Sequence, residues 1–451
     1  MYELIVIGGG PAGYNAAEKA AEGGLSTCVI EKRALGGTCL NEGCIPTKTL
    51  LYSAKIYDYA KHSAPYGVSF TGASIDHPAI IDRKNKVVKT LVAGVGSKMK
   101  SRGIDVIKET ARITGRKGDV FTVAAGDQVI EGRRILVCTG SEAALPPIDG
   151  LKDSLASGFA VTNREILDMK EVPGTLLVVG GGVIGLEMVS YYNSIGTEVI
   201  VLEMLDHIAG PTDREISGML KKEYEKRGVR FILGAKVTSV RDGKITYELG
   251  GESCEVKGDK ALISIGRRAV SAGLGLEELG VEIRRGAVVT DEHCRTSVPG
   301  IWAAGDVNGR SMLAHTAYRE GEAAVRDMLG IADKVDYDAI PSVIYTNPEV
   351  ACVGESEESA REKGLDVEIK KIPLRFSGRY LAENEGGNGI MKIIVDKEHG
   401  RILGFAMIGS YASEIIYGIA MMVGREMRLS EIQKYVFPHP TVGEAFREAI
   451  F

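Results

Sequence analysis

Two cysteines five positions apart, Cys39 and Cys44 in GGTCLNEGCIPTK, are the residues of this 451-residue chain whose types and spacing most directly suggest chemistry. Thiols this close can form a disulfide with a small loop, which stabilises a fold little and is easily reduced. The stretch beyond Pro46 has a helical pattern, and a thiol in the first turn of a helix has a lowered pKa. We therefore predict a redox-active pair with thiolates available near neutral pH. Two reduced, buried cysteines remain an alternative, and we expect no metal site because no second Cys or His pair accompanies them.

His439 in FPHPTVGEAFREAIF is a candidate acid-base group, because Glu444 follows five positions later. Pro440 can begin a helix at its first position, so that Glu444 on the next turn can reach one imidazole nitrogen. The other nitrogen would then exchange a proton, which disulfide chemistry needs because the attacking species is a thiolate. A surface or packing role is the alternative for His439. The remaining histidines have no ligand-like spacing and are interpreted as surface residues, with His315 excepted: His62, His77, His207, His293 and His399.

One pattern that occurs twice predicts the elements around these residues. Strand-like ELIVI precedes GGGPAG at 8–13, and strand-like TLLVV precedes GGGVIG at 180–185. Each loop opens a helical stretch, and a second apolar strand follows that ends in an acid, Glu31 or Glu203. The acid falls 23 residues after the first glycine in both copies (8 to 31, 180 to 203).

Each copy has the parts that a dinucleotide site needs. The loop glycines let the backbone approach a pyrophosphate, and the helix N-terminus stabilises its negative charge. These glycines are Gly8, Gly10 and Gly13 in the first loop and Gly180, Gly182 and Gly185 in the second. The acid accepts hydrogen bonds from ribose hydroxyls, and Glu203 would repel a 2′-phosphate, while Met204 and Leu205 supply no cation. The second site is therefore predicted to prefer NAD to NADP.

Composition narrows the class of protein. Charged residues make up 25% and apolar residues 44% of the chain, and the formal net charge is -5, which argues against nucleic acid or an anionic membrane as partner. The N-terminus starts directly with a strand, so we expect no signal peptide and a cytoplasmic location. The apolar stretch Ile415–Val423 is about half of what crosses a bilayer, and we expect a buried or interface helix there.

The chain resembles the pyridine nucleotide-disulfide oxidoreductase family over essentially its whole length, and most closely its members that oxidise dihydrolipoyl groups. GGTCLNEGCIPTK resembles the redox-active disulfide segment of that family, and TSVPGIWAAGDV resembles its second FAD motif. MLAHTAYREG is similar to the segment after that motif, and HPTVGE is similar to the C-terminal His-Glu dyad.

The resemblance implies roles for the reacting residues. Cys44 would be the thiol on the flavin side, and Cys39 the thiol that exchanges with substrate. Lys48 would lie near the flavin N5 and pair with Glu187, and a His439 from the partner subunit would serve as the base.

The resemblance also implies the cofactor contacts. Glu31 would bind the adenosine ribose of FAD, and Asp306 its ribityl chain. The remaining implied FAD contacts are Lys32, Thr38, Ala111, Thr139, Gly140, Ser141, Met312, Leu313, Ala314 and His315. On the NAD side the implied contacts beyond the loop are Glu187, Glu203, Val237 and Gly266.

The fold class expected is α/β, with two Rossmann-like dinucleotide-binding domains and a C-terminal α+β dimerisation domain. The FAD-binding domain would comprise 1–145 and 268–335, the NAD-binding domain 146–267, and the dimerisation domain 336–451. Alternating segments such as VEIKKIPL, GIMKIIVD and RILGFAMIG predict antiparallel strands in the last of these, with helices near 411–424 and 429–435.

The implied activity is oxidation of protein-bound dihydrolipoyl groups with reduction of NAD, by a homodimer that serves a 2-oxoacid dehydrogenase or glycine cleavage complex. Phe437 stands where members that oxidise dihydrolipoyl groups usually carry another His, so the substrate wall differs here. The alternative within the enzyme class is reduction of another low-molecular-weight disulfide by NADH. A scaffold or redox-sensing subunit is the alternative outside it, and the joint presence of Cys39, Cys44 and His439 disfavours that reading.

Overall fold

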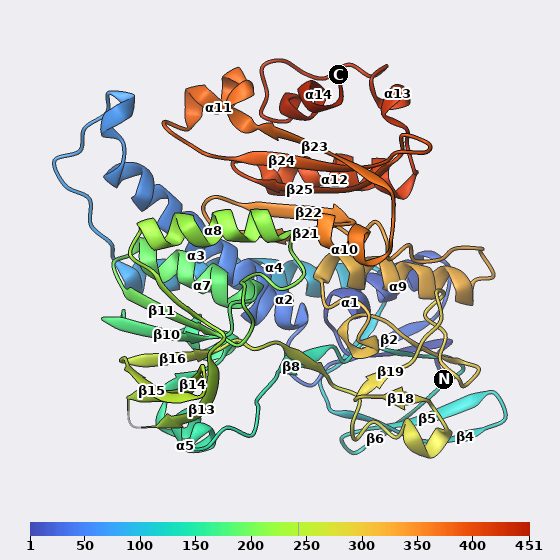
Figure 1. Cartoon of the computed structure of the whole chain (residues 1–451). Coiled ribbons are helices and arrows are strands. Elements are labelled where there is room, and N and C mark those ends of the chain that lie inside the picture. The colour runs from blue at the N-terminus through green and yellow to red at the C-terminus, as the bar shows by residue number, and fades with distance from the viewer. Residues whose placement is uncertain (242) are drawn as a thin grey trace. The chain divides into compact units, whose positions relative to one another are not determined.

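The computed structural model describes residues 1–241 and 243–451 (Figure 1). The chain forms two compact units, which we describe separately. The first comprises Met1–Thr49, Ile81–Ala144 and Gly266–Val335, and the second comprises Leu50–Ile80, Leu145–Ile265 and Asp336–Phe451. The division into three domains is finer than these two units and remains a prediction.

The first unit is built on a parallel sheet whose three central strands are buried, apolar runs, as expected where both faces of a parallel sheet are covered. The strands lie in the order β20 (Ile301–Ala303), β7 (Ile135–Val137), β1 (Leu4–Ile7), β2 (Thr27–Ile30) and β3 (Asp105–Ile107). All four pairings are parallel, so every strand ends at the same edge of the sheet.

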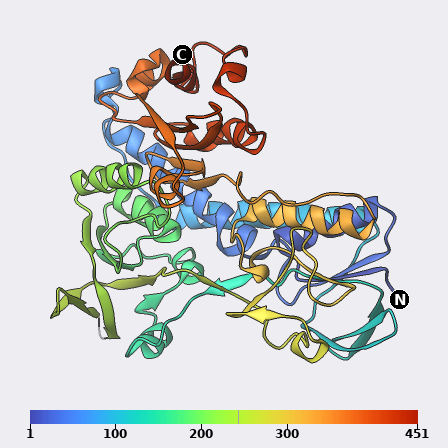
Figure 2. The same ribbon diagram turned by 45° about the vertical axis from the view of Figure 1, so that its right-hand side comes forward.

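Two helices of this unit, α1 (Pro11–Glu22) and α9 (Ala314–Met328), lie side by side in both views (Figures 1 and 2). Their contact is close because Gly321 faces α1, where an added Cβ would lie 2.7 Å from the carbonyl oxygen of Ala12. The short helix α2 (Gly37–Glu42) and the start of α3 (Cys44–Lys61) follow β2, and α4 (His77–Ser101) precedes β3. The unit also contains a three-stranded antiparallel sheet: β4 (Ala111–Lys117), β5 (Val120–Ala125) and β6 (Gln128–Gly132). Two further pairs of strands are antiparallel. They are β8 (Ser141–Ala143) with β17 (Arg267–Ala269), and β18 (Ile283–Arg284) with β19 (Ala287–Val288).

The second unit contains another parallel sheet with the same local pattern. Its strands lie in the order β12 (Arg230–Leu233), β11 (Glu198–Glu203), β10 (Thr175–Val179), β16 (Lys260–Ile263) and β9 (Ala160–Val161). Helices α7 (Val183–Ser194) and α8 (Arg214–Lys226) follow β10 and β11. A three-stranded antiparallel sheet belongs to the same part: β13 (Lys236–Arg241), β14 (Lys244–Leu249) and β15 (Glu252–Lys257).

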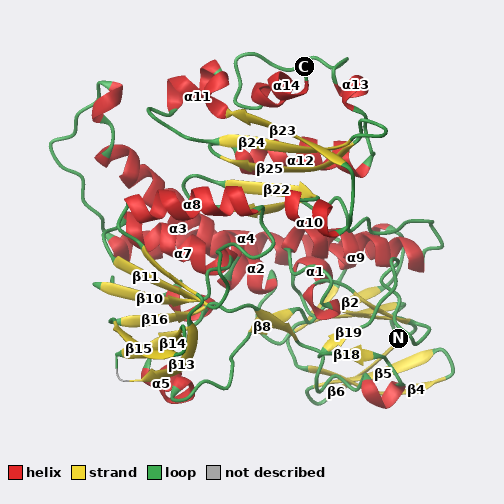
Figure 3. Cartoon of the chain, viewed as in Figure 1, coloured by secondary structure: helices red, strands yellow, loops and turns green. Residues whose placement is uncertain are grey.

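The C-terminal part of the second unit is an antiparallel sheet with helices, as predicted (Figure 3). The sheet has the order β21 (Ser342–Ile344), β22 (Val350–Gly354), β25 (Ile402–Ile408), β24 (Ile390–Asp396) and β23 (Val367–Pro373). Its helices are α10 (Glu357–Glu362), α11 (Gly378–Glu383), α12 (Ala412–Gly424), α13 (Leu429–Ile432) and α14 (Glu444–Ile450). α13 ends at Ile432, earlier than the predicted helix at 429–435.

The apolar stretch at 415–423 forms most of α12, and one face of this helix is buried. Ile416, Ile419 and Val423 pack into the core of this part, whereas Tyr417 and Met421 are exposed. Within the ranges 1–241 and 243–451, no helix combines the length and apolarity needed to cross a bilayer.

Candidate active site

The carboxyl edge of the first parallel sheet gathers most of the predicted FAD residues. Gly8 follows β1 with φ +107°, and an added Cβ would lie 2.2 Å from the carbonyl oxygen of Cys138, which follows β7. At Gly13 an added Cβ would lie 1.9 Å from the carbonyl oxygen of Gly8. Both positions therefore require glycine. Gly10 differs, because its nearest neighbour would be the Cα of Gly37 at 3.7 Å, so the space beside it is open to a ligand.

The start of α1 and the acid after β2 complete this loop. Among the described residues no side chain caps α1, so its first N–H groups can bind a pyrophosphate. Glu31 accepts a hydrogen bond from Gly9 N at 2.7 Å and another from Arg33 N at 2.7 Å, which fixes the carboxylate beside the loop. An open glycine loop, an uncapped helix and an anchored acid fit the pyrophosphate and ribose of FAD.

A second polar group at this edge contains three of the predicted FAD residues and an arginine that the sequence did not single out. Ser141 Oγ donates to the Asp306 carboxylate, and Arg267 Nε donates to Ser141 Oγ at 2.7 Å. Arg267 also donates to the carbonyl oxygen of Ser141 at 2.7 Å and to Thr38 Oγ1 at 3.4 Å. The signal for it was its place in IGRRAV, four positions after the last residue of the buried strand β16.

The other predicted FAD residues lie on the same unit, and their contacts with a cofactor remain predictions. Thr139 donates to Val270 O at 2.5 Å, and Gly140, with φ +69°, accepts from Val270 N at 3.0 Å. The remaining ones follow Glu31, begin β4 or surround the N-terminus of α9: Lys32, Ala111, Met312, Leu313, Ala314 and His315.

The predicted redox pair occupies two short helices next to the first loop. Cys39 lies in α2 and Cys44 is the first residue of α3, and both are partly buried free thiols. The pKa of Cys39 is raised above its ordinary value by the hydrogen bond to Cys44, then by burial and by the charge of Cys44, while Lys48 lowers it. The prediction that both thiolates are available near neutral pH is therefore wrong for Cys39. Sharing a proton with Cys44 and burial outweigh the helix position.

A pair of tyrosines that the sequence analysis did not single out lies near Cys39. The hydroxyls of Tyr14 on α1 and Tyr318 on α9 are hydrogen-bonded to each other, and their rings meet edge to face at 5.8 Å. The pKa of Tyr14 is raised by burial, by the bond to Tyr318 and by the charges of Tyr318, Cys39 and Glu18. Both phenols therefore keep their protons at neutral pH.

The second glycine loop repeats the geometry of the first within the other unit. Gly180 has φ +100°, with an added Cβ 2.6 Å from Ser264 O, and a Cβ on Gly185 would lie 2.3 Å from Gly180 O. Gly182 is the N-cap residue that precedes α7, and a Cβ there would meet no described atom within 4 Å. Glu203 accepts from Gly181 N at 2.6 Å and from Leu205 N at 2.8 Å, as Glu31 does in the first loop. This matched geometry fits a second dinucleotide.

Four further predicted residues lie elsewhere in the two units. Glu187 on α7 is buried and accepts from Tyr345 N at 3.1 Å. Val237 lies on β13 and is partly buried, and Gly266 belongs to the first unit. Lys48 also belongs to the first unit and Glu187 to the second, so their pairing remains a prediction.

The predicted contact between His439 and Glu444 is confirmed. His439 Nδ1 lies 2.7 Å from Glu444 Oε2, with the imidazole 79% and the carboxylate 13% exposed. The predicted helix start at Pro440 is wrong, because α14 begins at Glu444. Thr441 Oγ1 accepts from Glu444 N at 3.2 Å and donates to Pro438 O at 2.9 Å, so a turn precedes the helix.

His77 is a buried residue, and its interpretation as a surface residue is wrong. Its side chain bonds the Tyr191 hydroxyl through Nδ1 and the Met169 carbonyl oxygen through Nε2, both at 2.8 Å. Burial lowers the pKa of His77, so the imidazole is neutral. The sequence could not reveal this, because Met169 and Tyr191 lie about a hundred residues away.

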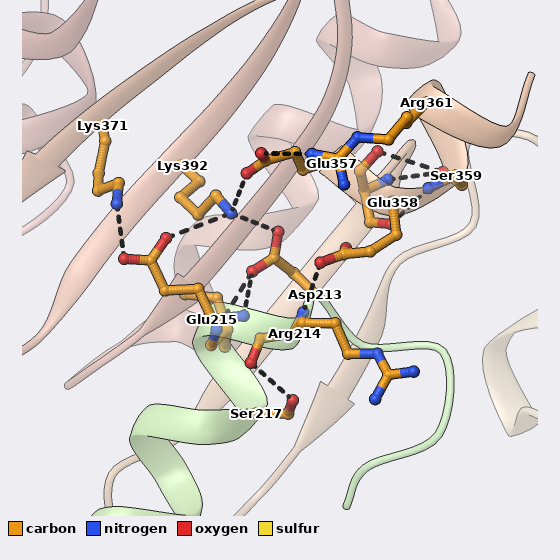
Figure 4. Close-up of polar contacts among 12 residues, drawn as sticks. Asp213, Arg214, Glu215, Ser217, Glu357, Glu358, Ser359, Arg361, Lys371 and Lys392 are labelled. Atoms are coloured by element: carbon orange, nitrogen blue, oxygen red, sulfur yellow. Dashed lines mark hydrogen bonds and ion pairs between the residues drawn. The ribbon is translucent and has the colours of Figure 1, made fainter. Parts of the chain in front are cut away.

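A buried lysine forms a charged cluster in the second unit (Figure 4). Lys392 on β24 is 1% exposed, and its Nζ lies 2.6 Å from Asp213, 3.0 Å from Glu357 and 3.4 Å from Glu215. Asp213 also caps α8 by accepting from Glu215 N and Ile216 N. Burial lowers the pKa of Lys392, but the bonds to Asp213 and Glu357 more than offset this, so the pKa is raised and the lysine is charged.

Two matched dinucleotide loops and a neighbouring pair of thiols define the class of the protein as a flavin- and pyridine-nucleotide-dependent disulfide oxidoreductase. The chain belongs to the pyridine nucleotide-disulphide oxidoreductase family, whose model matches residues 2–321, while the model of that family's dimerisation domain matches residues 340–450. FAD and NAD are its cofactors.

Known relatives cover almost the whole chain. The dihydrolipoyl dehydrogenase of Chlamydia muridarum is 38% identical over 451 residues, covering 99% of this chain and 96% of the relative. The crystal structure of LpdA from Mycobacterium tuberculosis is 28% identical, with a TM-score of 0.89, and the match covers 99% of this chain and 98% of that one. The HOCl-induced flavoprotein disulfide reductase RclA from Escherichia coli is 29% identical, with a TM-score of 0.86, and the match covers 100% and 99% of the two chains.

Proposed function

We propose that this chain oxidises protein-bound dihydrolipoyl groups to lipoyl groups and reduces NAD, using the disulfide of Cys39 and Cys44. The observation that carries this proposal is the contact between the redox helix and the first dinucleotide loop. A Cβ added at Gly37, the first residue of α2, would lie 2.6 Å from the Cα of Gly10. The helix that carries Cys39 therefore begins beside the cofactor loop. The dihydrolipoyl dehydrogenase named above supports the choice of substrate.

In the oxidised enzyme a substrate thiolate attacks Cys39 Sγ, the S–S bond breaks, and Cys44 leaves as a thiolate. The second substrate thiol then displaces Cys39 and closes the lipoyl disulfide. His439 takes the proton of the first substrate thiol, and the proton of the second substrate thiol passes to Cys39, whose raised pKa favours the protonated form. Bound FAD supplies the two-electron relay between the thiols and NAD.

We further propose a homodimer in which His439 and Glu444 of one subunit complete the site of the other. The matched dimerisation domain at 340–450 and the exposed imidazole of His439 support this arrangement. The division into an FAD-binding domain at 1–145 and 268–335, an NAD-binding domain at 146–267 and a dimerisation domain at 336–451 belongs to the same proposal.

Subunit exchange tests the shared site. A Cys39→Ser dimer and a His439→Gln dimer are each expected to have little activity. After the two are mixed and allowed to exchange subunits, half of the dimers are mixed, and each of those carries one intact site, so about a quarter of the wild-type rate should return. No recovered rate, with mixed dimers detected by mass spectrometry, would show that each site lies within one subunit.

The choice of NAD over NADP rests on Glu203. Its carboxylate is held next to the loop by two backbone N–H groups, and the following Met204 is 67% exposed and carries no charge. A 2′-phosphate at this place would face a negative charge without a cation. The proposed partner is a lipoyl-carrying protein of a 2-oxoacid dehydrogenase or glycine cleavage complex. We propose a cytoplasmic location, supported by the five cysteines other than Cys39 and Cys44, which are free thiols.

The second candidate function is reduction of another low-molecular-weight disulfide by NADH. Two observations favour it: the similarity to the disulfide reductase RclA and the place of Phe437, which packs against Phe446 near the proposed base. Steady-state rates with lipoamide and with other small disulfides, at equal NADH, distinguish the two functions.

A further inference from the structure

The phenol pair of Tyr14 and Tyr318 stands beside the helix that carries Cys39, and none of the exchange steps above uses it. Tyr14 N donates to Gly10 O at 2.9 Å, so Tyr14 lies one turn along α1 from the loop glycine that Gly37 of α2 approaches. Side chains of an α-helix point back toward its N-terminus. The Tyr14 phenol is therefore directed toward the start of α2, where Cys39 follows Gly37 by two positions.

Packing between α1 and α9 holds the two phenols together. Asn15 Nδ2 donates to the carbonyl oxygen of Tyr318 at 3.1 Å, and the rings of Tyr14 and Tyr318 meet edge to face at 5.8 Å. Both phenols are half-buried. Burial is the largest cause of their raised pKa values, and the charge of Cys39 raises both pKa values further. The pair is thus a fixed group within electrostatic reach of the Cys39 thiol.

Two phenols that bond to each other use only one of their two protons. Burial raises the pKa of both, but the shared bond raises the pKa of Tyr14 and lowers that of Tyr318, as expected where Tyr14 donates and Tyr318 accepts. Among the described residues, the O–H of Tyr318 has no second acceptor. Tyr318 therefore keeps one proton that it can donate to another group.

The other charged groups near the phenols and the thiols come from α1 and α3. After burial, Glu18 on α1 contributes to the raised pKa of both phenols. The bond to Cys44 and burial raise the pKa of Cys39, while Lys48 on α3 lowers it. Charge on Cys39 and charge on a phenol disfavour each other, so Tyr318 stays protonated when Cys39 becomes a thiolate. A neutral O–H donor is therefore available near the thiolate.

We propose that Tyr318, polarised by Tyr14, donates a hydrogen bond to the Cys39 sulfur, directly or through one water, when that sulfur carries negative charge. This inference rests on the proposed thiol exchange. When the second substrate thiolate closes the substrate disulfide, the bond between the substrate sulfur and Cys39 Sγ breaks, and its electron pair stays on Cys39 Sγ. A donor at this sulfur stabilises the leaving thiolate and so speeds its departure. Tyr318 keeps its own proton, because the proton that neutralises Cys39 comes from the substrate.

The pH dependence of alkylation at Cys39 tests the proposal without a dithiol substrate. The FAD-loaded enzyme is reduced anaerobically with stoichiometric dithionite and treated with iodoacetamide, which reacts with the thiolate, and the modified Cys39 peptide is quantified by mass spectrometry. Tyr318→Phe should raise the apparent pKa of the reduced pair by about one unit, because a hydrogen bond to a charged sulfur is lost. Tyr14→Phe should raise it less, and the double variant should equal Tyr318→Phe, because Tyr14 acts through Tyr318.

Tyr2→Phe is the matched control. Tyr2 is another phenol of the first unit, it donates to Asp105 at 2.7 Å, and it precedes β1 at the end away from the glycine loop. Tyr2→Phe should have the wild-type pH dependence, and all variants should bind FAD as the wild type does. An unchanged pKa in Tyr318→Phe, or an equal shift in Tyr2→Phe, would overturn the proposal.

A kinetic measurement separates this inference from the proposed function. Tyr318→Phe should slow NADH formation from dihydrolipoamide about tenfold and leave the reduction of FAD by NADH unchanged. Wild-type enzyme that does not oxidise dihydrolipoamide would count against the proposed function, whereas the alkylation result would still decide the role of Tyr318.

Discussion

Glu444→Gln tests how much the Glu444 carboxylate contributes to the reaction rate through its hydrogen bond to the proposed base, His439. Glu444 Oε2 lies 2.7 Å from His439 Nδ1, and the carboxylate is only 13% exposed, so solvent screens this bond little on the Glu444 side. A hydrogen bond to a charged group contributes about 1.5–3 kcal/mol and a neutral one about 0.5–1.5 kcal/mol. The substitution keeps an acceptor oxygen and removes the charge, so the expected loss is about 1–1.5 kcal/mol, which corresponds to a rate lower by about five- to thirteenfold.

The assay is steady-state NADH formation from dihydrolipoamide and NAD, with the KM for each substrate measured separately. The rate with dihydrolipoamide should fall by that factor, whereas the KM for NAD should not change, because Glu444 lies outside the second glycine loop. Glu444→Ala removes the acceptor altogether and should be slower than Glu444→Gln. FAD content, measured by absorbance, should equal that of the wild type in both variants.

Glu448→Gln is the matched control, because Glu448 lies one turn further along α14, is 48% exposed and pairs with Arg447. It should have the wild-type rate. The reasoning is refuted if Glu444→Gln retains the full rate, or if Glu448→Gln loses as much.

Three further predictions concern the NAD site and the stability of the second unit. Glu203→Ala with Met204→Arg should shift kcat/KM toward NADPH by at least about tenfold, and an unchanged ratio would contradict the role of Glu203. Gly182→Ala should fold normally, because an added Cβ meets no described atom within 4 Å. It should nevertheless raise the KM for NAD, and an unchanged KM would mean that no ligand approaches Gly182. Lys392→Met should lower stability by about 3–5 kcal/mol, seen as a lower denaturation midpoint of the FAD-loaded protein, because it leaves Asp213 buried and unpaired. Lys371→Met, at a lysine that is 45% exposed, should cost less than about 1 kcal/mol, and equal losses would contradict this reading.

Sequence patterns sufficed where local spacing determines the structure. The two strand-loop-helix-strand copies have their glycines and acids at fixed distances along the chain, so the loops around Gly8 and Gly180 could be predicted with their anchored acids. The same holds for the antiparallel strands β23, β24 and β25, whose periodicity is local.

Contacts between distant parts of the chain could not be predicted in this way. Tyr14 and Tyr318 are separated by 304 positions, Arg267 and Ser141 by 126, and Lys392 and Asp213 by 179. The burial of Cys39 could not be predicted from the sequence either, and this explains the wrong expectation for its thiolate. The pKa of Cys39 depends on the Cys44 thiol and on the surrounding core, and neither can be inferred from the position of Cys39 in a helix.

The central claim is that a dithiol substrate reduces the enzyme through Cys39 and Cys44, and anaerobic stopped-flow spectroscopy tests it most directly. The FAD-loaded enzyme is mixed first with dihydrolipoamide and then with NAD, while absorbance is recorded across the visible range. The account predicts a long-wavelength band after the first mixing and rapid NADH formation after the second, with neither in Cys44→Ser. Reduction by NADH without any reduction by dihydrolipoamide would contradict the claim and assign the pair to another disulfide substrate.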